Sequence, residues 1–149
     1  MTMKAGTVNK SISIQAPLSE VWDTLTNHDL IKLWLSENEI NVRSDWKAGS
    51  PIIFEGTWKE KDYEDKGTIV EFEHEKLFSY TFWSPFSMIE DLPENYSVVT
   101  FKLASQDNKT VLNVIHSNLK SKATHGHAIF YWTLTLTVIK DLVEKRHSK

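Results

Sequence analysis

The sequence predicts one α+β domain in which an antiparallel sheet of six or seven strands curls around a long C-terminal helix. Three observations lead to this prediction. Six consecutive segments between residues 39 and 116 alternate apolar and polar side chains, which is typical of half-buried strands. Two short amphipathic segments follow another alternating segment near the N-terminus. The end of the chain carries an apolar stripe at helical spacing.

The first alternating segment, residues 8–15, predicts a strand that ends at Pro17. Pro17 is also suited to open a helix, because its backbone is already close to helical geometry. Leu18–Thr26 places Val21, Trp22 and Leu25 at helical spacing. A second short helix is expected to begin at Asn27, a favourable N-cap residue. Its apolar residues are Leu30, Ile31, Trp34 and Leu35.

The middle of the chain predicts an antiparallel meander, because its strands follow one another with short connections. Residues 47–50 and 106–109 have turn composition, residues 61–66 suggest a charged loop, and residues 85–94 suggest a longer loop. In the third strand, Val70 and Phe72 are expected to point inward. The six predicted strands are residues 39–43, 51–59, 67–74, 76–84, 96–103 and 110–116.

The last segment has two competing patterns. Leu134, Leu136 and Val138 alternate with threonines, as in a strand. A stripe with 3-4-3-4 spacing nevertheless runs through about four helical turns, and basic residues follow where a helix would end. Length favours a helix over residues 126–146, since an isolated strand of some twenty residues would be unusual. The stripe consists of Ile129, Trp132, Leu136, Ile139 and Val143.

Length and composition indicate an ordinary globular protein. The 149 residues suit one domain, and a chain of this length buries about 70% of its unfolded surface without needing a disulfide or metal. A net charge of −3, with no local cluster of Lys and Arg, argues against nucleic-acid binding. The absence of cysteine excludes disulfides, thiolate nucleophiles and cysteine-based zinc sites.

The sequence gives no sign of secretion or of membrane insertion. Residues 1–8 lack the apolar core of a signal peptide. The longest apolar-rich stretch, residues 128–139, is too short to span a bilayer. We therefore expect a cytoplasmic protein with no membrane span.

The predicted order of a strand, two helices, six strands and a long helix is the helix-grip arrangement. Residues 14–17 (Ile-Gln-Ala-Pro), residues 21–26 (Val-Trp-Asp-Thr-Leu-Thr) and Trp34 resemble the opening of START-like proteins, the SRPBCC superfamily. Within it, the chain most resembles the bacterial family named after the activator of the heat-shock protein 90 ATPase (the AHSA type). Residues 66–71 with 76–81, and residues 97–103 with 110–118, resemble two hairpins of that family, and Trp132 matches a tryptophan common in its last helix.

The resemblance covers roughly residues 11–144. Two departures leave the subfamily open: only Gly49 occupies a turn where the family often has two glycines, and the last helix is rich in threonine. The resemblance implies a cavity between sheet and helix that holds an apolar or aromatic molecule. It also implies that a minority of relatives are enzymes, such as polyketide cyclases. The eukaryotic namesake acts on a chaperone, so a role in stress response is a further implication.

Motifs for catalysis and cofactor binding are missing from the sequence. It has no Gly-x-Ser-x-Gly, its five glycines are scattered, and no NAD, P-loop or zincin motif occurs. We therefore predict no cofactor and assign no catalytic residue. His125 and His127 would suit a metal on a strand, but at a helix start residues i and i+2 diverge. We expect both to be solvated, and no metal site.

Candidate ligand contacts are the aromatic and polar residues on the predicted inner faces. His116 shares a face with Leu112 and Val114, so it is either a hydrogen-bonded core residue or a ligand partner. Tyr80 has the same two interpretations, and packing alone would also explain the others. Apolar pockets with a few placed polar groups are typical of small-molecule sites. The predicted ligand-binding residues are Trp34, Phe54, Trp58, Tyr80, Phe101, His116, Trp132 and Leu136.

Three functions remain open, in this order of preference. The first is non-enzymatic binding of a small apolar or aromatic molecule in a closed, mostly apolar cavity of a few hundred Å³, on the order expected for such sites. The second is a protein-interaction module that modulates a chaperone ATPase through an exposed apolar patch. Candidates for that patch are Trp46, Trp83, Phe86 and Met88. The third is a cyclase or hydrolase using His116 and a cavity acid. The sequence also leaves a homodimer open.

Overall fold

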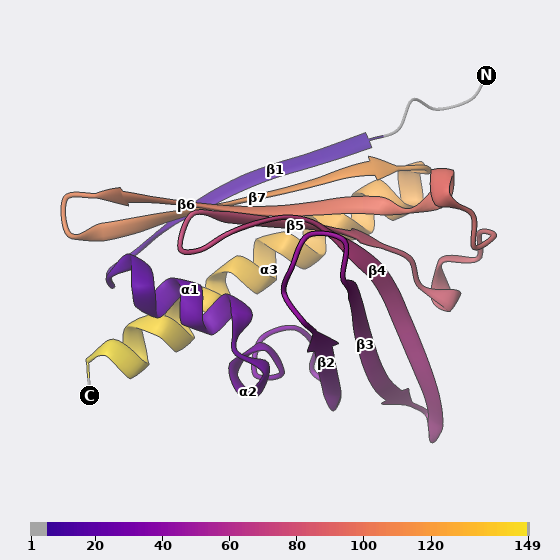
Figure 1. Cartoon of the computed structure of the whole chain (residues 1–149), viewed down its shortest axis with the longest axis horizontal. Coiled ribbons are helices and arrows are strands. Elements are labelled where there is room, and N and C mark those ends of the chain that lie inside the picture. The colour runs from indigo at the N-terminus through magenta and orange to yellow at the C-terminus, as the bar shows by residue number, and fades with distance from the viewer. Residues whose placement is uncertain (1–5, 149) are drawn as a thin grey trace.

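The computed structural model describes residues 6–148 and shows a seven-stranded antiparallel sheet with its α-helices on one face (Figure 1). The strands are β1 Gly6–Ile14, β2 Ile40–Ser44, β3 Pro51–Trp58, β4 Lys61–Glu73, β5 Leu77–Phe82, β6 Ser97–Gln106 and β7 Lys109–Leu119. The helices are α1 Leu18–Thr26, α2 His28–Ile31 and α3 Lys122–His147, with short 3₁₀ turns η1 Pro85–Ser87 and η2 Pro93–Asn95.

The sheet order is β1-β7-β6-β5-β4-β3-β2, and every neighbouring pair is antiparallel. The predicted meander of six strands is confirmed, and the first strand joins it beside the last. β1 and β2 form the two edges, so the sheet is not closed. In Figure 1, β2, β3 and the far part of β4 bend toward the helices, while α3 lies along the same face. This is the expected helix-grip arrangement.

The two short helices connect one edge of the sheet to the other. Val21, Trp22 and Leu25 of α1 are buried, as their helical spacing predicts. Asn27 caps α2 as expected: its side-chain oxygen accepts a hydrogen bond from the Asp29 backbone N–H at 3.0 Å. The Trp34 indole N–H then donates to the Thr24 carbonyl at 2.8 Å, which fixes the segment after α2 against α1.

The long C-terminal helix is confirmed, although it begins earlier than residue 126. Ser121 is the N-cap, with its hydroxyl accepting from the Thr124 N–H at 3.0 Å. Four residues of the predicted stripe are buried, but Ile129 is exposed, so its inward placement was wrong. Ala128 takes the inward position instead, because the buried positions Ala128, Trp132 and Leu136 follow one another at i, i+4 spacing.

The prediction of a charged loop at residues 61–66 was wrong, because these residues are the first half of β4. The turn consists of Lys59 and Glu60 alone, whose φ angles are 50° and 64°. Two positive φ values are the geometry of a tight hairpin turn, which usually selects Gly or Asn. The charged composition of this segment therefore suggested a loop, whereas the structure has a β-hairpin in which Trp58 pairs with Lys61.

The inward placement of Val70 was also wrong. The register between β4 and β5 shifts between Ile69 and Glu71, which marks a β-bulge. Ile69 is buried and Val70 is exposed. The extra residue restores the alternation, so that Phe72 faces the core and contacts the Trp22 ring at 5.4 Å between centroids.

The core beneath α1 and α2 is filled with aromatic rings. Phe78 is fully buried, with ring centroids 5.6 Å from Trp22, 5.5 Å from Trp46 and 5.1 Å from Phe101. The contacts with Trp22 and Trp46 are edge-to-face, a geometry that adds to the energy of burying each ring. This half of the interior is therefore packed solidly.

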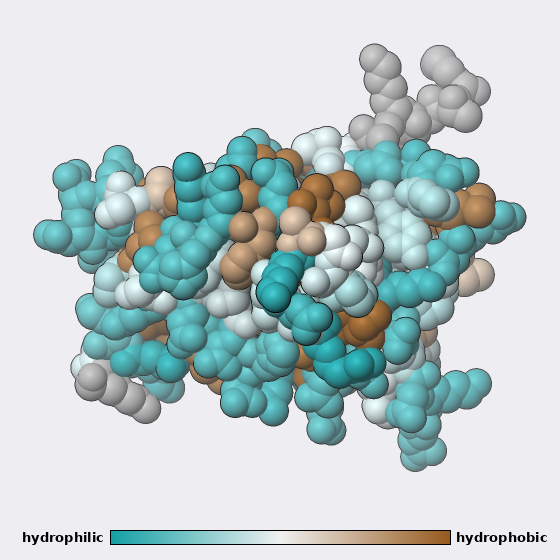
Figure 2. Space-filling view, in the orientation of Figure 1, coloured by the Kyte–Doolittle hydropathy of each residue, from teal (hydrophilic) through white to brown (hydrophobic). Residues whose placement is uncertain are grey.

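Figure 2 shows one face of the molecule, mainly hydrophilic with apolar residues exposed between. Within residues 6–148, no helix is both long and apolar enough to cross a membrane.

Candidate functional site

A cavity of about 510 Å³ lies between the sheet and the N-terminal half of α3. Its walls come from β3, β4, β5, β6 and β7 on one side and from α3 on the other, with the segment after α2 at one end. Such a volume is within the usual range for small-molecule sites. The cavity reaches the surface beside η1 and the first turns of α3, since its lining includes the exposed residues Phe86, Ser87 and Thr124. It is therefore open at one end, unlike the closed cavity expected.

Four of the eight predicted ligand-binding residues line this cavity. They are Phe54 of β3, Tyr80 of β5, His116 of β7 and Trp132 of α3. Their side chains converge because the inner faces of three strands and the buried stripe of α3 face one another.

The other four predicted residues lie elsewhere. Trp34 and Phe101 pack against each other at 6.2 Å and border a second space of only about 10 Å³. That space is at the lower limit for a single water molecule. Leu136 is buried on α3 but is not part of the cavity wall. Trp58 is 46% exposed near the β3–β4 turn, where it packs on Phe86 at 5.5 Å.

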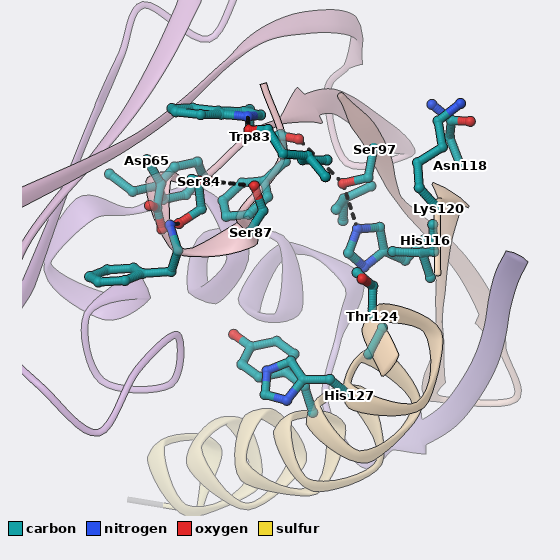
Figure 3. A pocket seen from close by; sticks show the side chains of 18 of the residues that line it. Asp65, Trp83, Ser84, Ser87, Ser97, His116, Asn118, Lys120, Thr124 and His127 are labelled. Atoms are coloured by element: carbon teal, nitrogen blue, oxygen red, sulfur yellow. Dashed lines mark hydrogen bonds between the residues drawn. The ribbon is translucent and has the colours of Figure 1, made fainter. Parts of the chain in front are cut away.

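His116 occupies the centre of a chain of hydrogen bonds. The Trp132 indole N–H donates to His116 Nδ1 at 3.1 Å, and His116 Nε2 lies 2.8 Å from the Ser97 hydroxyl oxygen. The Ser97 hydroxyl lies 3.4 Å from the Phe82 carbonyl, to which it donates. Figure 3 shows His116 and Ser97 together on one wall of the pocket.

This chain of hydrogen bonds determines which nitrogen of the neutral His116 ring carries the proton. Because Nδ1 accepts from Trp132, the proton of the neutral ring is on Nε2, which donates to Ser97. Burial lowers the pKa of His116 from 6.5 to about 4. Both ring nitrogens are thus occupied at neutral pH, and no lone pair is left to take a proton from a substrate.

The opposite wall carries an acidic group that the sequence prediction missed. Asp65 of β4 pairs with Phe54 of β3 in register, and both side chains line the cavity. Burial raises the pKa of Asp65, opposed in part by the Ser84 hydroxyl. Its Oδ1 atom is buried without a hydrogen-bond partner among the described residues. Figure 3 shows Asp65 and Ser84 across the pocket from His116, so the two titratable groups do not form a catalytic pair.

Tyrosines and indoles also contribute polar groups to the lining. The Tyr131 hydroxyl donates to the Leu35 carbonyl at 2.6 Å, and the Trp83 indole donates to the Ile89 carbonyl at 3.1 Å. Burial raises the pKa of Tyr80 and of Tyr131, so both phenols stay neutral. These groups fix the shape of the cavity without adding charge to it.

The two histidines at the start of α3 differ from each other. His125 is half-buried, and its Nε2 lies 3.0 Å from the Thr7 carbonyl. His127 is exposed but lines the mouth of the cavity, which its interpretation as merely solvated did not include. Residues 6–148 contain no group of three or more potential metal ligands.

The predicted apolar patch is not continuous. Trp46 is half-buried against the core, and its indole donates to His28 Nε2 at 3.0 Å. Trp83 lines the cavity, whereas Phe86 and Met88 are exposed on η1 and just after it. Phe86 packs edge-on against Tyr63 with 4.9 Å between centroids, which places η1 over the cavity wall.

Asp65 and Tyr63 were missed because residues 61–66 suggested a loop. Period-two alternation of Tyr63, Asp65 and Gly67 was the available signal, but charged residues at the alternate positions concealed it. Tyr131 was missed because it lies beside the predicted stripe of α3. Its inward position is evident only from its hydrogen bond to Leu35, which is distant in sequence.

The lining of the cavity favours a particular kind of ligand. Its wall is mainly aromatic and aliphatic, the polar groups around His116 bond to one another, and one carboxylate oxygen lacks a protein partner. This arrangement suits an apolar body with one polar end.

Comparison with known proteins agrees with this architecture. The sequence model of the family described as "Activator of Hsp90 ATPase homolog 1-like protein" matches residues 15–144. No curated protein sequence gives a significant match.

Three solved structures illustrate the similarity. Protein ChR145 from Cytophaga hutchinsonii is 34% identical with a TM-score of 0.80, over 100% of this chain and 99% of that chain. NE0264 from Nitrosomonas europaea is 17% identical with a TM-score of 0.76, covering 96% and 97%. The Aha1 dimer from Colwellia psychrerythraea is 20% identical with a TM-score of 0.73, covering 93% and 96%. The family match spans most of the chain, and the fold agrees with it. The chain therefore belongs to the family of Activator of Hsp90 ATPase homolog 1-like proteins, within the START-like superfamily.

Proposed function

We propose that this protein binds a small, mainly apolar or aromatic molecule in the cavity between the sheet and α3. The observation that carries this proposal is an open cavity of about 510 Å³ in a domain whose remaining interior is solidly packed. The apolar walls of such a cavity stay accessible to water and lack the contacts that a filled core would make. A bound molecule would recover those contacts.

The neutral fluorescent probe N-phenyl-1-naphthylamine tests the proposal. We expect saturable binding with one site per chain. Ala128→Phe should weaken that binding at least about tenfold, because Ala128 lines the cavity and a phenyl ring there would fill part of it. Ala123→Phe is the matched control, since Ala123 is exposed on the same helix and is not part of the wall.

Absence of saturable binding by the wild type, or equal binding by both variants, would sink the proposal. Native mass spectrometry of the purified protein would then identify any molecule that co-purifies. The cytoplasmic location and the link to stress response stay predictions from sequence.

A second candidate role, contact with another protein, is favoured by an exposed apolar face on α3. Phe130, Leu134 and Val138 succeed one another at i, i+4 spacing and are 65%, 53% and 44% exposed. Isolated apolar residues on a surface are common, but a continuous stripe of this kind marks an interaction site. A straight stripe on a helix is complementary to its own two-fold copy, so we infer a second copy of this chain as its occupant.

Sedimentation velocity at about 5–100 µM protein tests this second role. Dimerisation of the wild type should be abolished by Leu134→Lys and kept by Leu33→Lys, which changes an exposed leucine outside the stripe. A wild type that stays monomeric would refute self-association. Stimulation of a purified Hsp90 ATPase by that monomer would instead support the chaperone role suggested by the family's name.

A further inference from the structure

We propose that the ligand carries a protonated amino group on its apolar or aromatic body, and that Asp65 is the residue that binds this group. The inference rests on the proposed ligand-binding function and specifies the chemistry of the ligand. It would make Asp65 the residue that determines specificity in this cavity.

The position of Asp65 follows from the strand alternation of β4. Tyr63 and Asp65 are two residues apart and therefore point to the same face, where both line the cavity. The exposed Glu64 between them points away. The hairpin with β3 places Phe54 directly opposite Asp65, and Phe54 is also part of the wall. Asp65 is thus part of the cavity wall, between aromatic residues.

The carboxylate of Asp65 has no counter-charge from the protein. Within the described residues, no ion pair includes it. The adjacent Lys66 is engaged elsewhere, since its Nζ is 2.6 Å from Asp91 Oδ2 and lies over the Trp83 ring at 5.6 Å. Buried carboxylate oxygens normally have partners, and Oδ1 of Asp65 has none among residues 6–148. A ligand group that reaches the carboxylate would supply the missing counter-charge.

The polar groups around His116 do not compete for that ligand group, and Lys120, which also lines the cavity, lies with His116 across the pocket from Asp65 (Figure 3). His116, Ser97 and Trp132 bond to one another and to the Phe82 carbonyl. The Asn118 side-chain amide donates to the Glu94 and Tyr96 carbonyls. The polar end of a ligand is therefore recognised at the Asp65 wall and its apolar body fills the space toward Trp132.

An ammonium group fits the Asp65 wall better than a neutral donor does. It neutralises a carboxylate that burial has separated from water, and charge-assisted hydrogen bonds are about twice as strong as neutral ones. Phe54 and Tyr63 also line the cavity, and their rings would add favourable cation–π contacts to a bound ammonium group. A carboxylic acid at the same position would be repelled by Asp65.

Three naphthalene probes that differ only in the polar end test this proposal at about pH 7.5 by isothermal titration calorimetry. They are 2-(1-naphthyl)ethylamine, 2-(1-naphthyl)ethanol and 3-(1-naphthyl)propanoic acid. The wild type should bind the amine at least about tenfold more tightly than the alcohol, and the acid most weakly.

Asp65→Asn should remove most of the preference for the amine while changing alcohol binding less than about threefold. Asp65→Ser is a second neutral variant in case Asp65→Asn does not fold. Glu64→Gln is the matched control: it removes one negative charge from the adjacent exposed position and should leave all three affinities unchanged.

The outcomes separate this inference from the function on which it rests. If the alcohol binds the wild type but the amine has no advantage, or if both neutral Asp65 variants keep that advantage, the inference is overturned and the cavity function stands. If none of the three probes binds the wild type, and N-phenyl-1-naphthylamine does not bind either, the proposed function fails with it.

Discussion

The buried histidine of the cavity should make the stability of this protein fall in mild acid. His116 has a pKa of about 4 in the folded protein because burial disfavours the charged ring, against 6.5 as its ordinary value. Protonation would also place a proton on Nδ1, where the Trp132 indole already donates its own. Folding therefore requires the neutral imidazole.

The sign and size follow from proton linkage. Between pH 6.5 and pH 4 the unfolded chain binds a proton at His116 that the folded chain does not, so the free energy of unfolding decreases as the pH falls. Each pH unit within this window corresponds to about 1.4 kcal/mol. His116 should therefore cost the protein about 2 kcal/mol by pH 5 and about 3 kcal/mol by pH 4, relative to neutral pH.

Urea unfolding followed by tryptophan fluorescence, repeated between pH 4 and pH 7.5, measures this effect. His116→Gln is the reference, because glutamine keeps a donor and an acceptor but does not titrate. Other groups titrate equally in both proteins, so the difference between the two curves isolates His116. The free energy of unfolding of the wild type, relative to that of His116→Gln, should fall by about 3 kcal/mol on going from pH 7.5 to pH 4.

Parallel curves for the two proteins would refute the reasoning, since they would mean that His116 has the same pKa in the folded and unfolded states. The protonation state has an independent measurement. Nitrogen-15 chemical shifts of the His116 ring should report the neutral form, protonated at Nε2, down to about pH 5.

Three further stability predictions can be checked by urea unfolding at pH 7. Gly67→Ala should cost about 3 kcal/mol or prevent folding, because its Cβ would lie 1.6 Å from the Thr81 carbonyl oxygen; a loss below about 1 kcal/mol would contradict this. Gly126→Ala should gain about 0.5–1 kcal/mol, since this α3 position has open space around it; a loss would speak against it. Asp65→Asn should gain about 1 kcal/mol by removing the charge of a carboxylate that burial destabilises. Because the pKa of Asp65 is raised, that gain should disappear as the pH falls below 3.8, and a gain independent of pH would be inconsistent with it.

Several elements could be predicted from local pattern alone. Asn27 was identified as a cap because capping depends on the next few residues only. The turn at Asp107 and Asn108 was recognised for a similar reason, because Asp and Asn tolerate the positive φ of a tight hairpin, and both have it in the structure. Longer-range order then followed from the number of short strands, whose meander leaves little choice of partner.

The candidate site was predicted only in part. Phe54, Tyr80, His116 and Trp132 were placed on an inner face correctly, because alternation determines the face of a strand. Alternation does not determine depth along that face. Phe101 therefore looked equivalent to Tyr80, although the indole of Trp34 fills the space over Phe101 and leaves none for a ligand.

The amino-acid sequence by itself determined which segments are strands and helices and which faces are apolar, because those properties depend on spacing within a few residues. Only the tertiary structure decided that the interior is filled under α1 and empty under the first half of α3. It also decided that, within residues 6–148, Oδ1 of Asp65 lacks a partner and that His116 has two. Volume and hydrogen-bond satisfaction depend on side chains that are distant in sequence, and these meet only when the sheet bends around the helix.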